Sequence, residues 1–250
     1  MMLSFLNIAS GSKGNATIIY SENTVLLLDA GISLKKIKEG FALIQKNIQD
    51  LQGILITHEH SDHIAGLKPV RKYAPVYASE GTVAYDEEII PGVAFSIGDI
   101  LVLPFPTSHD ANNPIGFLFS HGDKTLFYMT DNGYVDETII NLVRGSDYMI
   151  IESNHDIKML RESNRPASLI RRIRGKKGHL SNRQCADCLF RIVGEKTKGI
   201  YLAHLSEECN KEELALQTAR DNLKKNPDVR PDLELKALRQ REMTFGGDQE

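Results

Sequence analysis

The seven residues from Thr57 to His63 have the types and spacing of a metal-binding motif. They read Thr-His-Glu-His-Ser-Asp-His and follow directly on the apolar run Gly53–Ile56. A divalent metal needs deprotonated nitrogen and oxygen ligands that converge from a short, rigid segment. The chain has 8 histidines in all, and three of them fall here beside an aspartate. The spacing therefore predicts a metal site at the end of a buried strand rather than a polar turn.

Other side chains of ligand type also stand where an apolar run ends. Loops at strand ends carry function on a rigid scaffold, so these residues are candidates for the same site. Any one of them could instead be a turn or capping residue. Together with the motif they favour a shared site. They are Asp29, His109, Asp131, Glu152 and His204, with His155 just behind Glu152.

The elements that position these residues alternate strands with helices. Apolar or alternating runs predict strands near 3–9, 16–21, 24–30, 53–57, 75–79, 93–103, 115–120, 124–130, 148–153 and 199–205. Helical periodicity predicts helices near 33–46, 64–73, 80–88, 135–143, 166–174, 182–194 and 210–225. Asn182 or Ser181 can cap the helix from 182, and Asn210 the last one. We expect a single α/β domain over residues 1–250, with two stacked sheets and helices outside.

Composition places the chain among soluble domains. It has 250 residues, 41% of them hydrophobic, and no apolar run approaching the ~18 residues of a membrane span. The N-terminal segment lacks the basic start of a signal peptide. The 3 cysteines are few and odd in number, which favours a reducing compartment. We therefore expect a cytoplasmic protein without membrane association; the oligomeric state is not readable.

The formal net charge of −3 conceals a strongly basic stretch between Lys158 and Arg183. This stretch holds nine basic residues against one acid, Glu162, and contains His179. A locally basic surface on a mildly acidic protein favours a polyanionic substrate over a merely solvated face. The stretch contains no aromatic residue, which argues against base stacking along it.

Three smaller features leave alternatives open. The loop Ser10–Asn15 contains glycines that let backbone N–H groups approach an anion, although a tight hairpin needs glycine too. Cys185-x-x-Cys188 lies in a helical pattern without a second pair, so we interpret both as buried core thiols. His121 lies in a predicted hairpin turn, where we expect it to be exposed and without function.

The order of these motifs resembles the metallo-β-lactamase superfamily, and within it the YycJ (WalJ/VicX) branch of nuclease-like proteins. The resemblance spans residues 10–210. It rests on the segments Ser10–Asn15, Leu28–Gly31, Thr57–His63, Ser108–Asp110, Thr130–Gly133, Glu152–Asp156, Gly178–Asn182 and His204–Asn210. It implies a four-layered αββα sandwich with two divalent metal ions, zinc or manganese, at one edge.

Carried over by position, the resemblance implies a full set of metal ligands. His58, His60 and His109 would hold one metal. Asp62, His63 and His204 would hold the other. Asp131 would bridge the two ions, as a shared carboxylate does in hydrolytic dinuclear sites.

The remaining roles follow from that arrangement. Asp62 would also accept a proton from the attacking water, and His179 would stabilise the phosphorane or protonate the leaving oxygen. Asp29 would orient a metal-binding histidine, and Glu152 and His155 would support the site in the same way. The residues expected to contact substrate are Ser12, Lys13, Asn15, Lys176, Lys177, Ser181 and Asn182.

Three functions compete at this stage. The first is a metal-dependent phosphodiesterase or nuclease, which the resemblance implies to be a 5′–3′ DNA exonuclease acting on DNA in preference to RNA. The second is a hydrolase of a small thioester, lactam or cyclic phosphodiester, and the basic stretch counts against it. The third is a metal-bound regulatory protein without turnover. The complete ligand set and the basic stretch favour the nuclease, although a fold does not settle a substrate.

Overall fold

The computed structural model describes residues 1–248. Backbone contacts group the chain into two compact units. The first unit comprises residues 1–106, 111–125 and the chain from 238 onward, and the second comprises 107–110 and 126–237. We describe each by itself, and the prediction of one domain stays a prediction. Among residues 1–248, no helix has the length and apolar character that crossing a bilayer requires.

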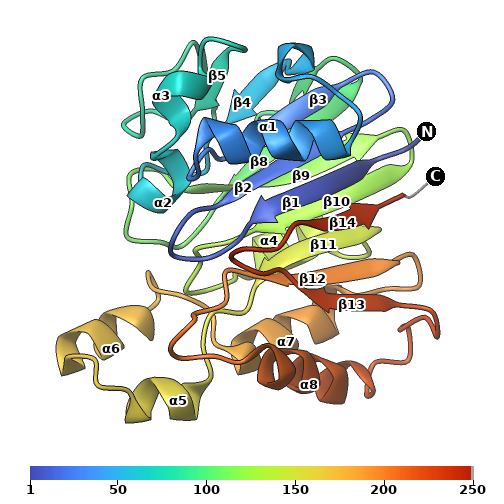
Figure 1. The fold of residues 1–250 in the computed structure, drawn as a ribbon. Coiled ribbons are helices and arrows are strands. Elements are labelled where there is room, and N and C mark those ends of the chain that lie inside the picture. The colour runs from blue at the N-terminus through green and yellow to red at the C-terminus, as the bar shows by residue number, and fades with distance from the viewer. Residues whose placement is uncertain (249–250) are drawn as a thin grey trace. The chain divides into compact units, whose positions relative to one another are not determined.

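A seven-stranded sheet with the order β14-β1-β2-β3-β4-β5-β6 forms the centre of the first unit (Figure 1). Neighbours are antiparallel from β14 to β3 and parallel from β3 to β6. Its strands are β1 (Ser4–Ala9), β2 (Ala16–Tyr20), β3 (Val25–Leu28), β4 (Gly53–Leu55), β5 (Val76–Ala78), β6 (Glu87–Glu88) and β14 (Thr244–Gly247).

Helix α1 (Leu34–Leu43) lies across this sheet in Figure 1. Ser33 caps its N-terminus by accepting a hydrogen bond from the Lys36 N–H. Ile37 and Phe41 bury the inner face of the helix in the core of the first unit. A Cβ at Gly40 would lie 2.7 Å from the end of the Ile8 side chain, which would have to shift to make room for it.

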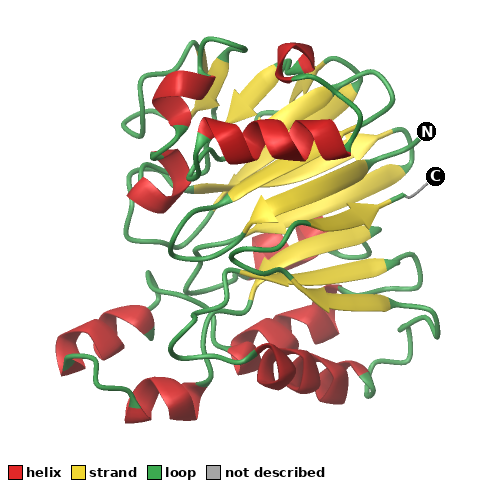
Figure 2. Ribbon diagram, in the orientation of Figure 1, coloured by secondary structure: helices red, strands yellow, loops and turns green. Residues whose placement is uncertain are grey.

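The first unit also contains an antiparallel run of β7 (Phe95–Ile97), β8 (Ile100–Pro106) and β9 (Ile115–His121). Short helices occupy the loops of the unit in Figure 2: η1 (Ile48–Asp50), α2 (Ser61–Ile64) and α3 (Leu67–Val70). Over part of β8 and β9, exposed or half-buried residues such as Leu101, Leu103 and Leu118 alternate with buried ones, as expected for strands with one face in a core.

Parallel strands form the centre of the second unit. In chain order they are β10 (Lys124–Met129), β11 (Tyr148–Glu152), β12 (Gly199–Ala203) and β13 (Glu234–Ala237). Because neighbouring strands run in the same direction, their carboxyl ends lie at one edge. The residues that follow β10, β11 and β12 are therefore brought together.

Five helices connect these strands (Figure 2). They are α4 (Glu137–Val143), α5 (Ile157–Glu162), α6 (Ala167–Ile173), α7 (Asn182–Ile192) and α8 (Glu212–Leu223). Ser181 begins α7 with a capping box shared with Gln184. Helices α5 and α6 lie between Glu152 and His179 in the chain and share a small apolar cluster of Leu160, Ile173 and Cys209.

Most predicted elements are confirmed, and the errors have local causes. The predicted helix at 80–88 is wrong: Gly81 has a φ of 79°, Asp86 accepts a hydrogen bond from the Val76 N–H, and the segment ends in β6. The single strand at 93–103 is two strands, which turn at Gly98, and the helix at 64–73 is two short helices. Elements η1, α5, β6, β13 and β14 were not predicted.

Two local predictions are also wrong. His121 is largely buried, and its ring contacts the Met2 carbonyl oxygen at 2.8 Å and Asp99 at 3.4 Å. Asn210 does not cap α8, whose N-cap is Lys211. The Asn210 amide bonds instead to the Ser153 backbone and to Asn182, because it is buried beside the strand ends.

Candidate metal centre

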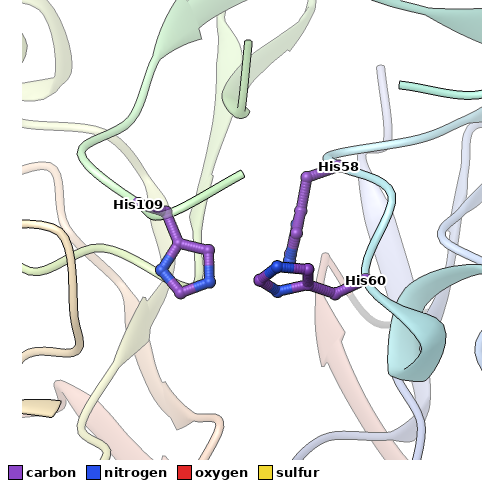
Figure 3. A group of neighbouring side chains, drawn as sticks. All are labelled: His58, His60 and His109. Carbon is purple, nitrogen blue, oxygen red and sulfur yellow. The ribbon is translucent and has the colours of Figure 1, made fainter. Parts of the chain in front are cut away.

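The histidine motif forms the loop that follows β4 and includes the short helix α2. His58 and His63 are fully buried, and His60 is half-buried at the N-cap of α2. Figure 3 shows His58 and His60 projecting from this one loop. Their ring centroids lie 4.6 Å apart at an angle of 75°, and the His58 and His63 rings lie 4.1 Å apart. The motif thus gathers three imidazoles in a small volume.

Backbone contacts fix this loop against the residue before β2 and the turn after β3. The Asn15 N–H donates to the Asp62 carbonyl oxygen at 2.7 Å, and the Ala30 N–H donates to the His63 carbonyl oxygen at 2.8 Å. A Cβ at Gly31 would lie 1.6 Å from the Asp62 carbonyl oxygen. Only glycine fits there, so Gly31 allows the motif loop to approach the turn.

Asp29 connects to the motif through side-chain hydrogen bonds. Its carboxylate accepts from the His63 Nδ1 at 2.7 Å and from the Thr57 hydroxyl at 2.9 Å. Because the Thr57 hydroxyl donates its one proton to Asp29, its oxygen accepts from the His58 Nδ1, which lies 3.0 Å away. Both rings therefore carry their proton on Nδ1, which leaves Nε2 with a lone pair.

The second unit brings acid and imidazole groups together at the carboxyl ends of its parallel strands. Asp131 follows β10, Glu152 ends β11 and His204 follows β12. His109 and His179 come from loops of the same unit. All except the half-buried His179 are at most 3% exposed.

Three histidine nitrogens surround one oxygen of Asp131. The Nε2 atoms of His204 and His109 lie 3.5 Å and 3.9 Å from Asp131 Oδ1, and the Nδ1 atom of His179 lies 3.8 Å from it. The His109 Nδ1 donates to the Gly178 carbonyl oxygen at 3.1 Å. Its Nε2 therefore carries the lone pair and lies near two carboxylates, 3.4 Å from Asp110 Oδ1 and 3.9 Å from Asp131 Oδ1.

Glu152 is a fully buried carboxylate that accepts hydrogen bonds from two of these histidines and from the backbone. One carboxylate oxygen accepts from the Nδ1 atoms of His179 at 2.8 Å and His204 at 3.0 Å. The other accepts from the backbone N–H groups of Leu180 at 2.8 Å and Asn132 at 3.1 Å. Burial alone would raise the pKa of Glu152, but the charge and hydrogen bonds of the two histidines outweigh it and lower the pKa to about 2.

The pKa values of the neighbouring histidines are shifted in opposite directions. Burial would lower the pKa of His179, yet the adjacent Glu152 carboxylate raises it above its ordinary value. Burial lowers the pKa of His109, although the charge of Asp131 partly opposes this. Burial also lowers the pKa of His155 to about 4. The site thus favours a charged His179 beside neutral His109 and His155.

Three of the strand-end residues have left-handed backbone conformations. The φ angles of Asp29, Asp131 and His204 are 58°, 52° and 54°. Non-glycine residues rarely adopt this region, and the conformation costs free energy. All three lie at or just after the end of a strand, where the chain leaves the extended conformation.

The donor set fits a metal ion. His58, His63, His109 and His204 each have Nδ1 hydrogen-bonded to an oxygen acceptor, so Nε2 is the atom with which each ring would bind a metal. The Asn15 amide contacts the His63 Nε2 at 3.0 Å. Within the second unit, the ligand atoms of Asp131, Glu152, His179 and His204 all lie within 4.8 Å of one another. Imidazole Nε2 with carboxylate oxygen is a donor set that binds zinc and related divalent ions.

The residues predicted to contact substrate differ in position. Ser12, Lys13, Lys176 and Lys177 are exposed. Asn15 is buried and its amide contacts Asp62 and His63 at 3.2 Å and 3.0 Å. Ser181 and Asn182 are also buried, the first capping α7 and the second bonding to Ser153 and Asn210. The side chains of these last three are therefore occupied by structural hydrogen bonds.

The cysteine prediction is confirmed, and two residues of interest were missed. Cys185 and Cys188 are buried free thiols, and burial raises the pKa of Cys188 to about 12. Thr57, which joins Asp29 to two histidines, lies inside the motif but its hydroxyl had no assigned role. Tyr134, three residues after Asp131, was also missed, because an isolated tyrosine gives no sequence signal.

Comparison with known proteins identifies the class. A family model described as a beta-lactamase superfamily domain matches residues 24–204, so the chain belongs to this superfamily. Exodeoxyribonuclease YycJ of Bacillus anthracis is 41% identical over 229 residues, covering 86% of this chain and 87% of the relative. Exodeoxyribonuclease WalJ of Streptococcus pneumoniae serotype 2 is 40% identical over 232 residues, covering 86% of each. Within the superfamily, the chain lies in the YycJ-like branch.

Solved structures confirm the predicted fold class. The metallo-beta-lactamase fold protein YhfI of Bacillus subtilis matches with a TM-score of 0.70 at 15% identity, over 97% of this chain and 99% of that protein. The short form of human tRNase Z matches with a TM-score of 0.63 at 14% identity, over 96% and 98%. The chain therefore has the αββα metallo-β-lactamase fold.

Proposed function

We propose that this protein is a metal-dependent nuclease that removes nucleotides from an end of DNA. The arrangement that carries the proposal is the cluster around Asp131, where His109 and His204 turn Nε2 toward one carboxylate oxygen while Glu152 holds His179 beside it. The two relatives that are about 40% identical are both named exodeoxyribonucleases, which supports DNA as the substrate.

The proposal assigns seven residues to two divalent ions. His58, His60 and His109 would hold one ion, and Asp62, His63 and His204 would hold the other. Asp131 would be shared by both. The Nδ1 hydrogen bonds of four of these histidines support the assignment, because they set the tautomer in which Nε2 can bind a metal. Zinc and manganese both suit this mixture of imidazole and carboxylate.

Asp29 and Glu152 orient the ligands rather than binding metal themselves. Asp29 fixes the His63 ring and, through Thr57, the His58 ring. Glu152 fixes the rings of His204 and His179 with one oxygen. Such partners of metal ligands typically contribute 10- to 100-fold to metal affinity or activity. His155, which is buried and three residues after Glu152 in the chain, would support this arrangement.

Divalent ions, when bound, supply Lewis-acid activation of water and neutralise charge on a phosphodiester. The chain's own residues handle the protons. Asp62 accepts the proton of the attacking water, and its partly exposed carboxylate lies 3.5 Å from the His63 Nε2. Glu152 holds His179 through Nδ1 and raises its pKa, so that the protonated ring would present Nε2–H to the leaving oxygen.

The basic stretch supplies the affinity for a polyanion. Arg171, Arg174, Lys176 and Lys177 are exposed in the second unit, which also holds His179. Arg172 is exposed as well but is paired with Asp110. Neutralisation of phosphates by such side chains provides most non-specific nucleic-acid affinity. From the resemblance to the YycJ-like branch we propose 5′–3′ polarity, and from the few, odd-numbered cysteines we propose a cytoplasmic location.

End-labelled DNA tests the function directly. Metal-free protein receives zinc, manganese or magnesium separately, and the products are separated by size. We expect nucleotides to be released from one end only in the presence of zinc or manganese, and Asp131→Ala to lose both bound metal and activity. DNA labelled at the 5′ end and DNA labelled at the 3′ end are compared, and the label that is released first shows the polarity. Intact DNA under every metal would refute the nuclease assignment.

A further inference from the structure

Tyr134 is an exposed aromatic residue close in the chain to the proposed metal bridge. Its side chain is 49% exposed, and it lies three residues after Asp131. Single exposed apolar residues are common on protein surfaces and need no explanation by themselves. Tyr134 differs because of the loop that carries it and the charged residue beside its ring.

The loop that carries Tyr134 is held rigidly. The Gly133 N–H donates to the Ser108 carbonyl oxygen at 2.9 Å, and the Asn132 amide donates to the Tyr134 carbonyl oxygen at 2.9 Å. A Cβ at Gly133 would lie 2.5 Å from the carbonyl oxygens of both Gly175 and Lys176. This close backbone contact needs glycine, and it brings the segment before His179 against the loop after Asp131.

Lys176 lies over the ring as a result. Its Nζ atom is 5.3 Å from the centroid of the Tyr134 ring, within the range of a cation–π interaction. The Lys176 carbonyl oxygen accepts a hydrogen bond from the Ser108 hydroxyl at 2.8 Å, which fixes the backbone below it. An aromatic face and an ammonium group are thus presented together on a rigid part of the surface.

These two groups match the two parts of a nucleotide. We propose that Tyr134 and Lys176 form a nucleotide subsite, in which a nucleobase stacks on the tyrosine ring and its phosphate contacts the ammonium group. The proposal rests on the proposed nuclease function and specifies its substrate. A base can stack on the ring only if its own face is free, so the subsite takes a nucleotide that is outside the duplex stack.

The basic stretch Lys158–Arg183 contains no aromatic residue, so the sequence argued against base stacking along it. The fold supplies one from elsewhere, because Tyr134 is brought to Lys176 across 41 intervening positions. Stacking on an aromatic side chain tolerates any base, since every base has a π face. We therefore expect the subsite to bind nucleotides without sequence preference, as an exonuclease requires.

An abasic scan tests this subsite. A single abasic residue is moved stepwise from the end of a single-stranded oligonucleotide, and kcat/KM of the metal-loaded protein is measured for each. At one position we expect the wild-type protein to lose about 5- to 150-fold, the typical worth of one base–aromatic stack. Tyr134→Ala should show a similar loss on intact DNA and no further loss with the abasic residue at that position. Tyr134→Phe should retain the discrimination, because the ring remains.

Tyr85→Ala is the matched control, because Tyr85 is also an exposed tyrosine but belongs to the first unit. It should keep the wild-type abasic profile. An unchanged abasic profile in Tyr134→Ala would overturn the proposal, and so would an equal loss on all oligonucleotides, which indicates a structural role.

Binding separates this proposal from the proposed function. The affinity of metal-loaded protein is measured by fluorescence anisotropy with oligonucleotides whose phosphorothioate linkages resist cleavage. A Tyr134-dependent abasic profile in binding, with no cleavage under any metal, would keep the subsite and refute the nuclease. Cleavage of DNA without a Tyr134-dependent abasic profile would keep the nuclease and refute the subsite. No binding at all would refute both the nuclease and the subsite.

Discussion

Replacing Glu152 with glutamine should destabilise the metal-free protein in a pH-dependent way. The carboxylate is fully buried and accepts four hydrogen bonds, two from histidine Nδ1 atoms and two from backbone N–H groups. A glutamine of the same shape has one accepting end and one donating end. Whichever way its amide points, two donors face its NH2 group.

The size of the effect follows from the shift in pKa. A fall from 4.5 to about 2 is roughly 2.5 units, and at about 1.4 kcal/mol per unit the native contacts of the ionised Glu152 contribute about 3 kcal/mol. The folded pKa lies below the unfolded one. This contribution is therefore fully present above about pH 4.5 and is lost as the pH falls through about 2.

Urea unfolding of metal-free protein at a series of pH values measures this contribution. We expect Glu152→Gln to be less stable than wild type at pH 7 by about 3 kcal/mol, with the difference shrinking between about pH 4.5 and pH 2. Glu195→Gln, at an exposed glutamate, serves as the control and should leave the profile unchanged. Equal stabilities of Glu152→Gln and wild type at pH 7, or a constant difference across the pH range, would refute this reasoning.

Three further substitutions test other parts of the structure. Asp29→Asn should weaken zinc binding about 10- to 100-fold, measured by competition with a fluorescent chelator, because the amide no longer sets the tautomers of two histidines; unchanged affinity would contradict that role. Gly31→Ala should displace the motif loop and lower both metal content and the melting temperature, whereas Gly194→Ala, where a Cβ meets only an ordinary contact at 3.5 Å, should not. The double change Arg171→Ala and Lys177→Ala should lower the slope of log K against log salt for duplex DNA by up to about 1.8 while metal content stays the same; an unchanged slope would place the DNA elsewhere.

The sequence predicted the strand-end residues because their signals are local. An apolar run followed by Asp131, Glu152 or His204 is visible within six residues, and parallel strands then bring such ends to one edge. The same reasoning failed where local preference was weak. Strands β13 and β14 have four residues each and little apolar character, and their pairing partners lie far away in the chain.

The hydrogen-bond partners within the site were less accessible to sequence reasoning. Asn15 follows a glycine-rich loop and looked like a phosphate contact, but its amide bonds to the motif loop 47 residues away. The proximity of Tyr134 to Lys176 depends on a single close backbone approach at Gly133. Contacts of this kind arise from tertiary packing and have no periodic pattern in the chain.

The three left-handed strand ends connect fold to function. A non-glycine residue in this region costs of order 1 kcal/mol or more, and Asp29, Asp131 and His204 all accept that cost. Surrounding contacts compensate: the Asp29 N–H bonds to Leu55, the Asn132 N–H bonds to Glu152, and the His204 carbonyl oxygen accepts from the Asn154 amide. An extended continuation of these strands would point alternate side chains to opposite faces of the sheet. In each unit these left-handed residues lie at or just after the end of a strand, so the strain falls on residues that bind the proposed metal ions or orient their ligands.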